Sequence, residues 1–398
     1  MYDDLDTYAI IDLDAIRHNI REIKNKFHNL DIMFVLKADA YGHKATKIYK
    51  LLLSEGADKF AVANLSEALE LRKIDRTAEI LVLGRIAPAN IRTAIESEIS
   101  MTVYSKECWE NIFSRICHGD KNIRLHIKIN TGFNRLGFNT DHDHDSIEAI
   151  KNMTECGMVS VESIYSHFAL ADYERDREQF DRFSSFIREL KDKGIKVPKM
   201  HMADSITAVD YPWARMDMVR IGALIYGLKA DRESYKNFDL RYSMKLYSTV
   251  TQVRSISRGE GVSYDYFFKA EKDMKIAALA FGYADGYPRQ LWKNGYVLIN
   301  NKKAYFTGLM CMDQCMVDVT DIEGVKPGDK VCIYDTDTDS EVSLASIAIM
   351  AGTNKNNIIS SLSRRVPRVY LSDGKKYIIN QLTGEEDFYE ASNRHNGS

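Results

Sequence analysis

Short apolar runs alternate with longer amphipathic stretches over the first 230 residues or so. The first amphipathic stretch has apolar residues at helical spacing from Ile16 to Phe27, and Asp12 or Asp14 is placed to cap that helix. Eight apolar runs have the length of buried strands: 32–38, 60–63, 79–84, 100–104, 125–130, 161–167, 199–202 and 218–222. The segments between them predict helices at 65–73, 88–97, 105–116, 143–156 and 173–193.

A repeated strand, helix, strand order predicts a parallel sheet covered by helices. Eight such units close a (β/α)8 barrel of the TIM type, and an open doubly wound sheet has the same alternation. The length of the eight units favours the barrel. We therefore predict an α/β fold in which residues 11–235 form a (β/α)8 TIM-like barrel, with the join to a second domain at 228–240.

The pattern changes after about residue 228. Alternating and β-branched runs separated by turns predict a mainly antiparallel β domain over residues 236–388, with one helix at 343–352. Residues 1–10 are expected to associate with this domain, and residues 389–398 to form a loose tail.

Two turns are marked in the second domain. Asn294-Gly295, between the runs LWK and YVLIN, is typical of a two-residue hairpin loop. Pro327-Gly328-Asp329 predicts a second turn before the run KVCIYD.

The charge balance narrows the kinds of partner. Lys and Arg total 54 against 57 Asp and Glu, so a net charge of -3 offers no basic field for nucleic acid. The first residues, MYDDLDTYAIIDLDAI, lack the basic start of a signal peptide, and no run approaches the 18 apolar residues of a membrane span. We expect a cytoplasmic protein that binds a small molecule or a protein, with neither nucleic acid nor membrane as partner.

Six scattered cysteines do not predict a disulfide framework. Cys311 and Cys315 are the one close pair, and no second pair or nearby histidine completes a zinc site. We expect buried thiols and no metal.

Polar side chains come at the C-terminal ends of the predicted strands, where barrel enzymes have their active sites. Lys37 directly follows the run IMFVL, although a single lysine there more often just leaves the sheet into solvent. A single histidine such as His167 or His201 is likewise more often a satisfied core or surface residue. A site is indicated because many polar residues share this location at the strand ends. These residues are Lys37, Tyr41, His43, Lys128, Arg135, His167, Asp204, Ser205, Arg220 and Gly222. Gly222, at the last strand end, suits a phosphate because exposed backbone amides bind anions.

Eight motifs in order along both predicted domains resemble the alanine racemases. They are VLKADAYGHKA, KINTGFNRLGF, SHFA, VRIGALIYGL, GVSYDYF, FGYADGYPR, GLMCMDQCMVDV and RRVPR. The resemblance covers nearly the whole chain. It implies a barrel that binds pyridoxal 5'-phosphate (PLP), a C-terminal β domain and a homodimer with shared active sites.

The resemblance implies a role for each motif residue. Lys37 would hold PLP covalently and act as base on one face of the substrate, with Tyr264 of the partner subunit on the other face. Arg220 would lie against the pyridine nitrogen, His167 against the ring and Arg135 at the phenolic oxygen. The phosphate would lie among Tyr41, Ser205, Gly222 and Ala223.

Further residues have supporting roles by the same resemblance. Met312 and Asp313 of the partner subunit would lie near the substrate carboxylate, and Tyr283 would line the entrance corridor. Lys128, carbamylated in many family members, would orient Arg135. An always cationic arginine at the pyridine nitrogen disfavours its protonation and so restrains side reactions such as transamination.

One position departs from the family pattern. Where the family has a tyrosine just before its final RVPR, this chain has Arg364. An arginine still suits the phosphate but changes the space and polarity beside the substrate side chain. The implied activity is alanine racemisation that supplies D-alanine for peptidoglycan, and Arg364 raises a racemase of serine or another amino acid as the alternative. A non-catalytic PLP-binding protein is a third alternative, against which the β domain counts.

Overall fold

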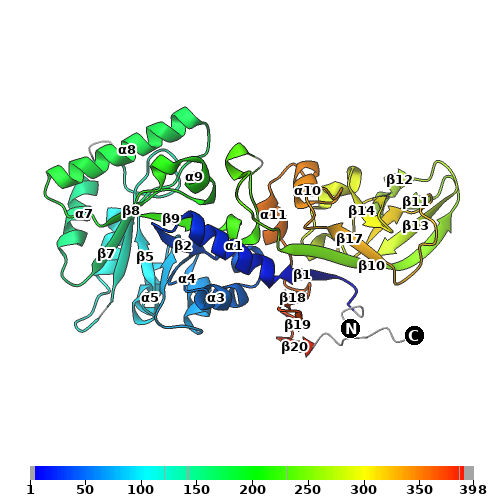
Figure 1. The fold of residues 1–398 in the computed structure, drawn as a ribbon, viewed down its shortest axis with the longest axis horizontal. Helices are drawn as coiled ribbons and strands as arrows, with labels where there is room; N and C mark the ends of the chain where they lie inside the picture. Colours follow the sequence, from blue (N-terminus) through cyan, green and yellow to red (C-terminus); the bar gives the residue numbers. More distant parts are fainter. Residues whose placement is uncertain (1–4, 121, 141–142, 231, 385, 390–398) are drawn as a thin grey trace.

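The chain forms two units that lie next to each other, a barrel and a β domain (Figure 1). The computed structural model describes residues 5–120, 122–140, 143–230, 232–384 and 386–389. The predicted tail at 389–398 lies outside the described residues except for Tyr389. In these ranges no helix has the length and apolar character needed to cross a membrane.

Eight parallel strands form a nearly closed barrel, which confirms the predicted fold class and excludes the open doubly wound sheet. Their order around the barrel is β8-β7-β6-β5-β4-β3-β2-β9. The edges meet where Asp217 N donates to Met200 O at 3.1 Å and Arg220 N donates to Ala203 O at 3.0 Å. The strands are β2 (Asp31–Val35), β3 (Lys59–Val62), β4 (Glu79–Val82), β5 (Ser100–Val103), β6 (Arg124–Lys128), β7 (Ser160–Tyr165), β8 (Lys199–His201) and β9 (Met218–Ile221).

Helices surround the barrel where the amphipathic stretches predict them. Asp12 caps the first helix, since its Oδ1 accepts from Ala15 N at 2.8 Å. The helix predicted at 88–97 begins instead as a 3-10 turn, η1 (Pro88–Asn90). The barrel helices are α1 (Leu13–Lys26), α3 (Ala45–Ser54), α4 (Leu65–Arg72), α5 (Ile91–Glu96), α6 (Lys106–Phe113), α7 (His144–Glu155), α8 (Tyr173–Asp192) and α9 (Ser205–Asp210).

The second unit is built on a mainly antiparallel sheet with the strand order β15-β14-β17-β10-β1-β18-β19-β20. The N-terminal strand β1 (Tyr8–Asp12) lies inside this sheet, antiparallel to β10 and parallel to β18. Strands β13 and β16 extend it beside β10, and β11 with β12 forms a small hairpin. The bounds are β10 (Met244–Ile256), β11 (Gly261–Val262), β12 (Phe268–Lys269), β13 (Met274–Leu279), β14 (Tyr296–Ile299), β15 (Lys302–Tyr305), β16 (Cys315–Asp318), β17 (Lys330–Tyr334), β18 (Arg368–Ser372), β19 (Lys375–Ile379) and β20 (Glu386–Tyr389), with the helices α10 (Leu344–Met350) and α11 (Lys355–Ser360).

The hairpin predicted at Asn294-Gly295 is wrong. The hairpin between β14 and β15 turns at Asn300 and Asn301, whose φ angles of 50° and 59° suit a two-residue loop. Gly295 instead permits a close approach, because a Cβ there would lie 2.6 Å from Leu291 O. The turn predicted at Pro327-Gly328-Asp329 is confirmed, with Asp329 N donating to the oxygen of Lys326.

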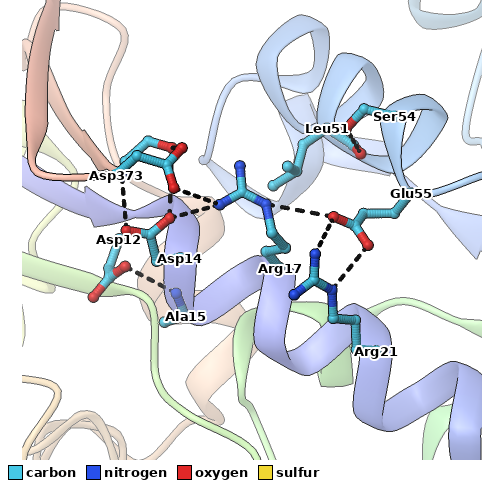
Figure 2. Close-up of polar contacts among 10 residues, drawn as sticks. Asp12, Asp14, Ala15, Arg17, Arg21, Leu51, Ser54, Glu55 and Asp373 are labelled. Atoms are coloured by element: carbon cyan, nitrogen blue, oxygen red, sulfur yellow. Dashed lines mark hydrogen bonds and ion pairs between the residues drawn. The ribbon is translucent and has the colours of Figure 1, made fainter.

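The two units share a chain segment and a core. β1 of the sheet runs straight into α1 of the barrel, and one apolar cluster extends through both units. Figure 2 shows ion pairs at this join: Arg17 lies 2.7 Å from Asp14, 3.4 Å from Glu55 and 3.6 Å from Asp373 of the β18–β19 turn. Each exposed ion pair contributes little to the free energy of folding, so the two units are held together mainly by the shared apolar cluster.

Candidate active site

A cavity of about 430 Å³ lies at the C-terminal ends of the barrel strands. The structure brings many of the predicted site residues into its wall: Lys37, Tyr41, Lys128, Arg135, His167, Ser205, Arg220, Gly222 and Ala223. The same wall contains residues that the sequence reasoning missed, among them Tyr165 and the pair Asn354 and Asn356 of the second unit. No motif marks the two asparagines, which reach the cavity only because α11 packs against the barrel.

Lys37 follows β2 through an unusual backbone turn. β2 ends at Val35 rather than at residue 38 as predicted, because Ala38, Asp39 and Ala40 have φ angles of 55°, 52° and 55°. Tyr41 continues the left-handed turn with a φ of 53°. Each such residue costs about 1–2 kcal/mol, so the surrounding structure has to hold the turn in place.

Hydrogen bonds from three directions hold this turn. Ala38 N donates to Glu67 Oε1 at 2.7 Å, and Asp39 Oδ1 accepts from Ala45 N at 2.8 Å. From the second unit, the buried guanidinium of Arg368 donates to Gly42 O at 3.3 Å. The β domain therefore helps to fix the position of Lys37.

The surroundings of Lys37 favour its neutral amine. Burial and then the positive charge of Arg135 lower the pKa of Lys37, and Asp204 opposes them only in part. The side chain is still accessible from the cavity. A lysine in this setting is a better nucleophile and base than one in water.

Arg220 lies buried under the cavity, and its donors are largely used by the protein. Nη1 donates to His201 Nδ1 at 2.6 Å, and Nη2 donates to Ser166 O at 2.9 Å, Met202 O at 3.0 Å and His167 Nδ1 at 3.1 Å. Nε–H is left without a partner in the described ranges. Burial and Arg220 lower the pKa of His167 to about 2, so this imidazole is neutral. The cavity wall therefore offers the Nε–H of Arg220 as a donor, next to the neutral imidazole of His167.

The cavity wall carries an excess of positive charge. Lys128 is only 6% exposed, and burial with Arg220 and Arg135 holds its pKa well below the usual value. The Lys128 ammonium lies 5.0 Å from the centre of the Tyr165 ring, and in the described part of the chain no carboxylate lies within 4.0 Å of Lys128 or Arg135. Because buried charges need a counter-charge, this wall fits an anionic ligand.

One end of the cavity gathers unused donors. Gly222 N donates to Ser205 Oγ at 2.9 Å, which leaves the Ser205 hydroxyl hydrogen free. The N–H of Ala223 and the hydroxyl of Tyr41 also lack partners among the described residues. A Cβ on Gly222 would lie 2.5 Å from Tyr41 Oη, so only glycine fits here. These donors suit phosphate oxygens, and the cavity as a whole fits PLP.

Asp204 also lines this cavity, whereas the predicted site residues of the second unit do not. Tyr264 is 64% exposed and Met312 is 54% exposed, and they lie in the second unit. The β11–β12 hairpin that carries Tyr264 lies at the far end of the molecule from the barrel (Figure 1). Within one chain, the two predicted bases Lys37 and Tyr264 are therefore apart.

These outlying residues form a group of their own. Tyr283 N donates to Cys311 O at 3.2 Å, and Ala284 N donates to Met312 O at 3.0 Å. Arg365 lies 2.6 Å from Asp313. Ser263 Oγ, next to Tyr264, donates to Leu309 O at 2.6 Å, so the Tyr264 loop and the 309–313 loop are in contact.

The other predictions have mixed outcomes. Arg364 is exposed and is not in the cavity wall. The prediction of buried thiols is wrong for Cys117, which is exposed in the loop after α6, while Cys315 is buried. Over the part of the chain that the structure describes, no three His, Cys, Asp or Glu side chains gather as a metal site.

Known proteins resemble this chain along nearly its whole length. Family models described as "Alanine racemase, N-terminal domain" and "Alanine racemase, C-terminal domain" match residues 11–230 and 243–370. An alanine racemase of Methanococcus maripaludis is 39% identical over 370 residues, which are 92% of this chain and 98% of the relative. One of Clostridium tetani is 38% identical over 373 residues, 92% of this chain and 96% of the relative.

Solved structures agree. Alanine racemase of Clostridium difficile 630 superposes with a TM-score of 0.85 at 32% identity, over 95% of this chain and 99% of that one. Alanine racemase of Bacillus anthracis with bound L-Ala-P gives a TM-score of 0.86 at 30% identity, over 95% and 98% of the two chains. On these matches, the chain belongs to the alanine racemase family.

Proposed function

We propose that this protein interconverts L- and D-alanine with PLP held by Lys37. The observation that carries the proposal is the single cavity that joins the Lys37 amine, the buried Arg220 and the unused donors around Gly222. Two solved relatives, described with bound L-Ala-P and with cycloserine, support an amino acid as ligand. When bound, PLP withdraws electrons from the substrate and makes its α-proton acidic.

The chain's own residues would orient the cofactor. Ser205 Oγ–H, Ala223 N–H and the Tyr41 hydroxyl would bind the phosphate. Arg220 would donate Nε–H to the pyridine nitrogen, and because arginine stays cationic it disfavours a proton on that nitrogen. Neutral His167 would pack against the ring, and Arg135 would reach the phenolic oxygen and the substrate.

Two groups would handle the α-proton. Racemisation needs a base on one face of the carbon and an acid on the opposite face. Lys37 Nζ, whose pKa is lowered, would serve one face. Tyr264 would serve the other, from a second subunit, because within one chain it lies away from the cavity.

We therefore propose a homodimer with shared sites. Its support is the exposure of Tyr264 and Met312 at the outlying group, together with the strained loop there. Asp265 and Tyr266 have φ angles of 59° and 46°, a strain that proteins retain mainly at functional positions. Met312 and Asp313 would lie near the substrate carboxylate of the partner's site, and Tyr283 would line its entrance.

We also propose that Lys128 is carbamylated. Its lowered pKa favours the neutral amine, which would add carbon dioxide and release one proton, leaving an anionic carbamate beside Arg135. A 13C resonance from labelled bicarbonate, lost in Lys128→Ala, would support this modification. A cytoplasmic location and the supply of D-alanine for peptidoglycan belong to the same proposal.

The test is racemisation by the purified protein with and without PLP. We expect L- and D-alanine to interconvert only with PLP, and Lys37→Ala to be inactive. No interconversion in the loaded wild type would refute the proposal. A panel of L-amino acids tests the serine alternative that Arg364 raises, which a higher kcat/KM for serine than for alanine would favour.

A further inference from the structure

A row of polar side chains crosses the barrel interior below the cavity. Arg220 Nη1 lies 2.6 Å from His201 Nδ1, and His201 Nε2 lies 2.8 Å from Ser163 Oγ. Ser163 Oγ lies 2.6 Å from His126 Nδ1, and His126 Nε2 lies 2.8 Å from Glu79 Oε1. The row therefore begins at the arginine under the cavity and ends at a carboxylate.

The position of these residues excludes a chance surface contact. Arg220, His201, Ser163 and His126 lie on the neighbouring strands β9, β8, β7 and β6 and are at most 5% exposed. Glu79 is the first residue of β4, so it lies at the end of the barrel opposite the cavity. No residue of the row except Arg220 is in the cavity wall.

Elementary hydrogen-bond chemistry gives the row one direction. An arginine only donates, so His201 Nδ1 has to accept and His201 carries its proton on Nε2. That N–H donates to Ser163 Oγ, which leaves the serine hydroxyl to donate to His126 Nδ1. His126 then carries its proton on Nε2, which faces Glu79 Oε1 at 2.8 Å. Each donor has an acceptor only in this arrangement.

The charges at both ends agree with that direction. Burial, Arg220 and His126 hold the pKa of His201 well below its usual value, so it is neutral. Burial alone would raise the pKa of Glu79, but His126, Lys59 and Arg124 outweigh it and lower that pKa. Glu79 is therefore a carboxylate at one end of a row whose other end is the Arg220 cation.

The contact at the Glu79 end has one geometric peculiarity. Glu79 Oε1 and His126 Nε2 lie 2.8 Å apart but out of line for a hydrogen bond, and neither atom has a hydrogen-bond partner in the described part of the chain. A buried donor and acceptor without other partners favour each other strongly, because leaving both unpaired costs free energy.

We propose that Glu79 is a positioning residue for Arg220: through His126, Ser163 and His201 it fixes a one-way hydrogen-bond relay that aims the Arg220 Nε–H into the cavity. Glu79 touches neither substrate nor cofactor, and it acts by fixing where the protons of the relay lie. The consequence for the cofactor rests on the proposed function, whereas the tautomers of the two histidines do not.

The first test uses the protein without cofactor. Long-range 15N–1H spectra of the 15N-histidine-labelled chain report which ring nitrogen carries the proton. We expect His126 and His201 as neutral Nε2–H tautomers at neutral pH, assigned with His126→Gln and His201→Gln. A proton on Nδ1 of either ring would overturn the relay.

The second test is a double-mutant cycle on PLP affinity. Glu79→Leu and Ser163→Ala should each weaken PLP binding roughly tenfold, and the double variant should be no weaker than the weaker single one, because the links act in series. Glu79→Gln keeps an acceptor oxygen and should stay closer to wild type. Ser100→Ala removes a buried barrel hydroxyl that has no hydrogen-bond partner among the described residues, and this variant should bind PLP as wild type does.

The outcomes separate the relay from the proposed function. Effects that multiply in the double variant, or unchanged PLP affinity in Glu79→Leu, would overturn the relay. Wild-type protein that binds no PLP would refute the proposed function, and the tautomer measurement would still decide the relay. If Ser163→Ala fails to fold, the relay is still tested by the histidine tautomers and by comparing the PLP affinity of Glu79→Leu with that of Glu79→Gln.

Discussion

Replacing Gly222 with alanine is expected to damage both the folding and the cofactor site of this protein. The added Cβ would lie 2.5 Å from Tyr41 Oη and 3.2 Å from the ring carbon that bears it. Tyr41 is buried and packs on Tyr226, with 5.2 Å between the ring centres, so it has little room to move. The φ of Gly222 is -123°, outside the left-handed region, so the contact of the added Cβ with Tyr41 is the expected cause of the effect.

The structure sets the size of the effect. Overpacking of a well-packed site costs about 1–3 kcal/mol. Gly157→Ala is the matched control, because no atom of the described residues beyond its chain neighbours lies within 4 Å of a Cβ added to Gly157. This variant should stay within about 0.5 kcal/mol of wild type. Urea unfolding followed by circular dichroism measures the unfolding free energy, and titration with PLP measures affinity.

A second substitution isolates the cause. Tyr41→Phe removes the oxygen that the Cβ would meet, so adding it to Gly222→Ala should restore part of the lost unfolding free energy. If Gly222→Ala has the same unfolding free energy and the same PLP affinity as Gly157→Ala, the close approach of Gly222 to Tyr41 does not affect stability or binding. If Tyr41→Phe gives no recovery, the loss has a cause other than this contact.

Two further predictions concern stability. Arg368→Leu should cost roughly 3 kcal/mol or more of unfolding free energy, because the backbone carbonyls of Gly42, Leu362, Ser363 and Val366 lose a charged donor. Thermal unfolding at the wild-type level would contradict this. Burial lowers the pKa of His43 from 6.5 to about 3. At a pH between these two values, His43 is protonated in the unfolded chain and neutral in the folded chain. The unfolding free energy should therefore fall as pH falls through this range, with a shallower slope in His43→Gln, and equal slopes in urea titrations would count against it.

The barrel was predictable from sequence because its strands are buried on both faces. Residues such as Ile80, Leu81 and Val82 form a continuous apolar run, and that run marks β4 directly. The end of β2 was not predictable, because the left-handed turn at Ala38 depends on Glu67 and other distant partners. The misplaced hairpin at Gly295 has a similar cause: a glycine needed for close packing has the same sequence signal as one needed for a turn.

The candidate site was predictable where residues lie at or just after the C-terminal ends of strands, as Arg220 and Lys37 do. Asn354 and Asn356 could not be found, because only the packing of α11 on the barrel brings them to the cavity. The relay to Glu79 was equally hidden. His126 and Ser163 lie inside predicted strands, where a polar side chain signals only an inward or outward direction and not its partner.

In the proposed homodimer, each active site combines Lys37 of one chain with Tyr264 of the other. Lys37→Ala and Tyr264→Phe should each be inactive alone, although Tyr264→Phe should still bind PLP. After the two variants are unfolded, mixed in equal amounts and refolded, half of the dimers carry one chain of each kind and one intact site. Racemase activity should then return to about one quarter of the wild-type level. A mixture that stays inactive while mixed dimers are shown to form would contradict the shared site, and so would full activity of Tyr264→Phe alone.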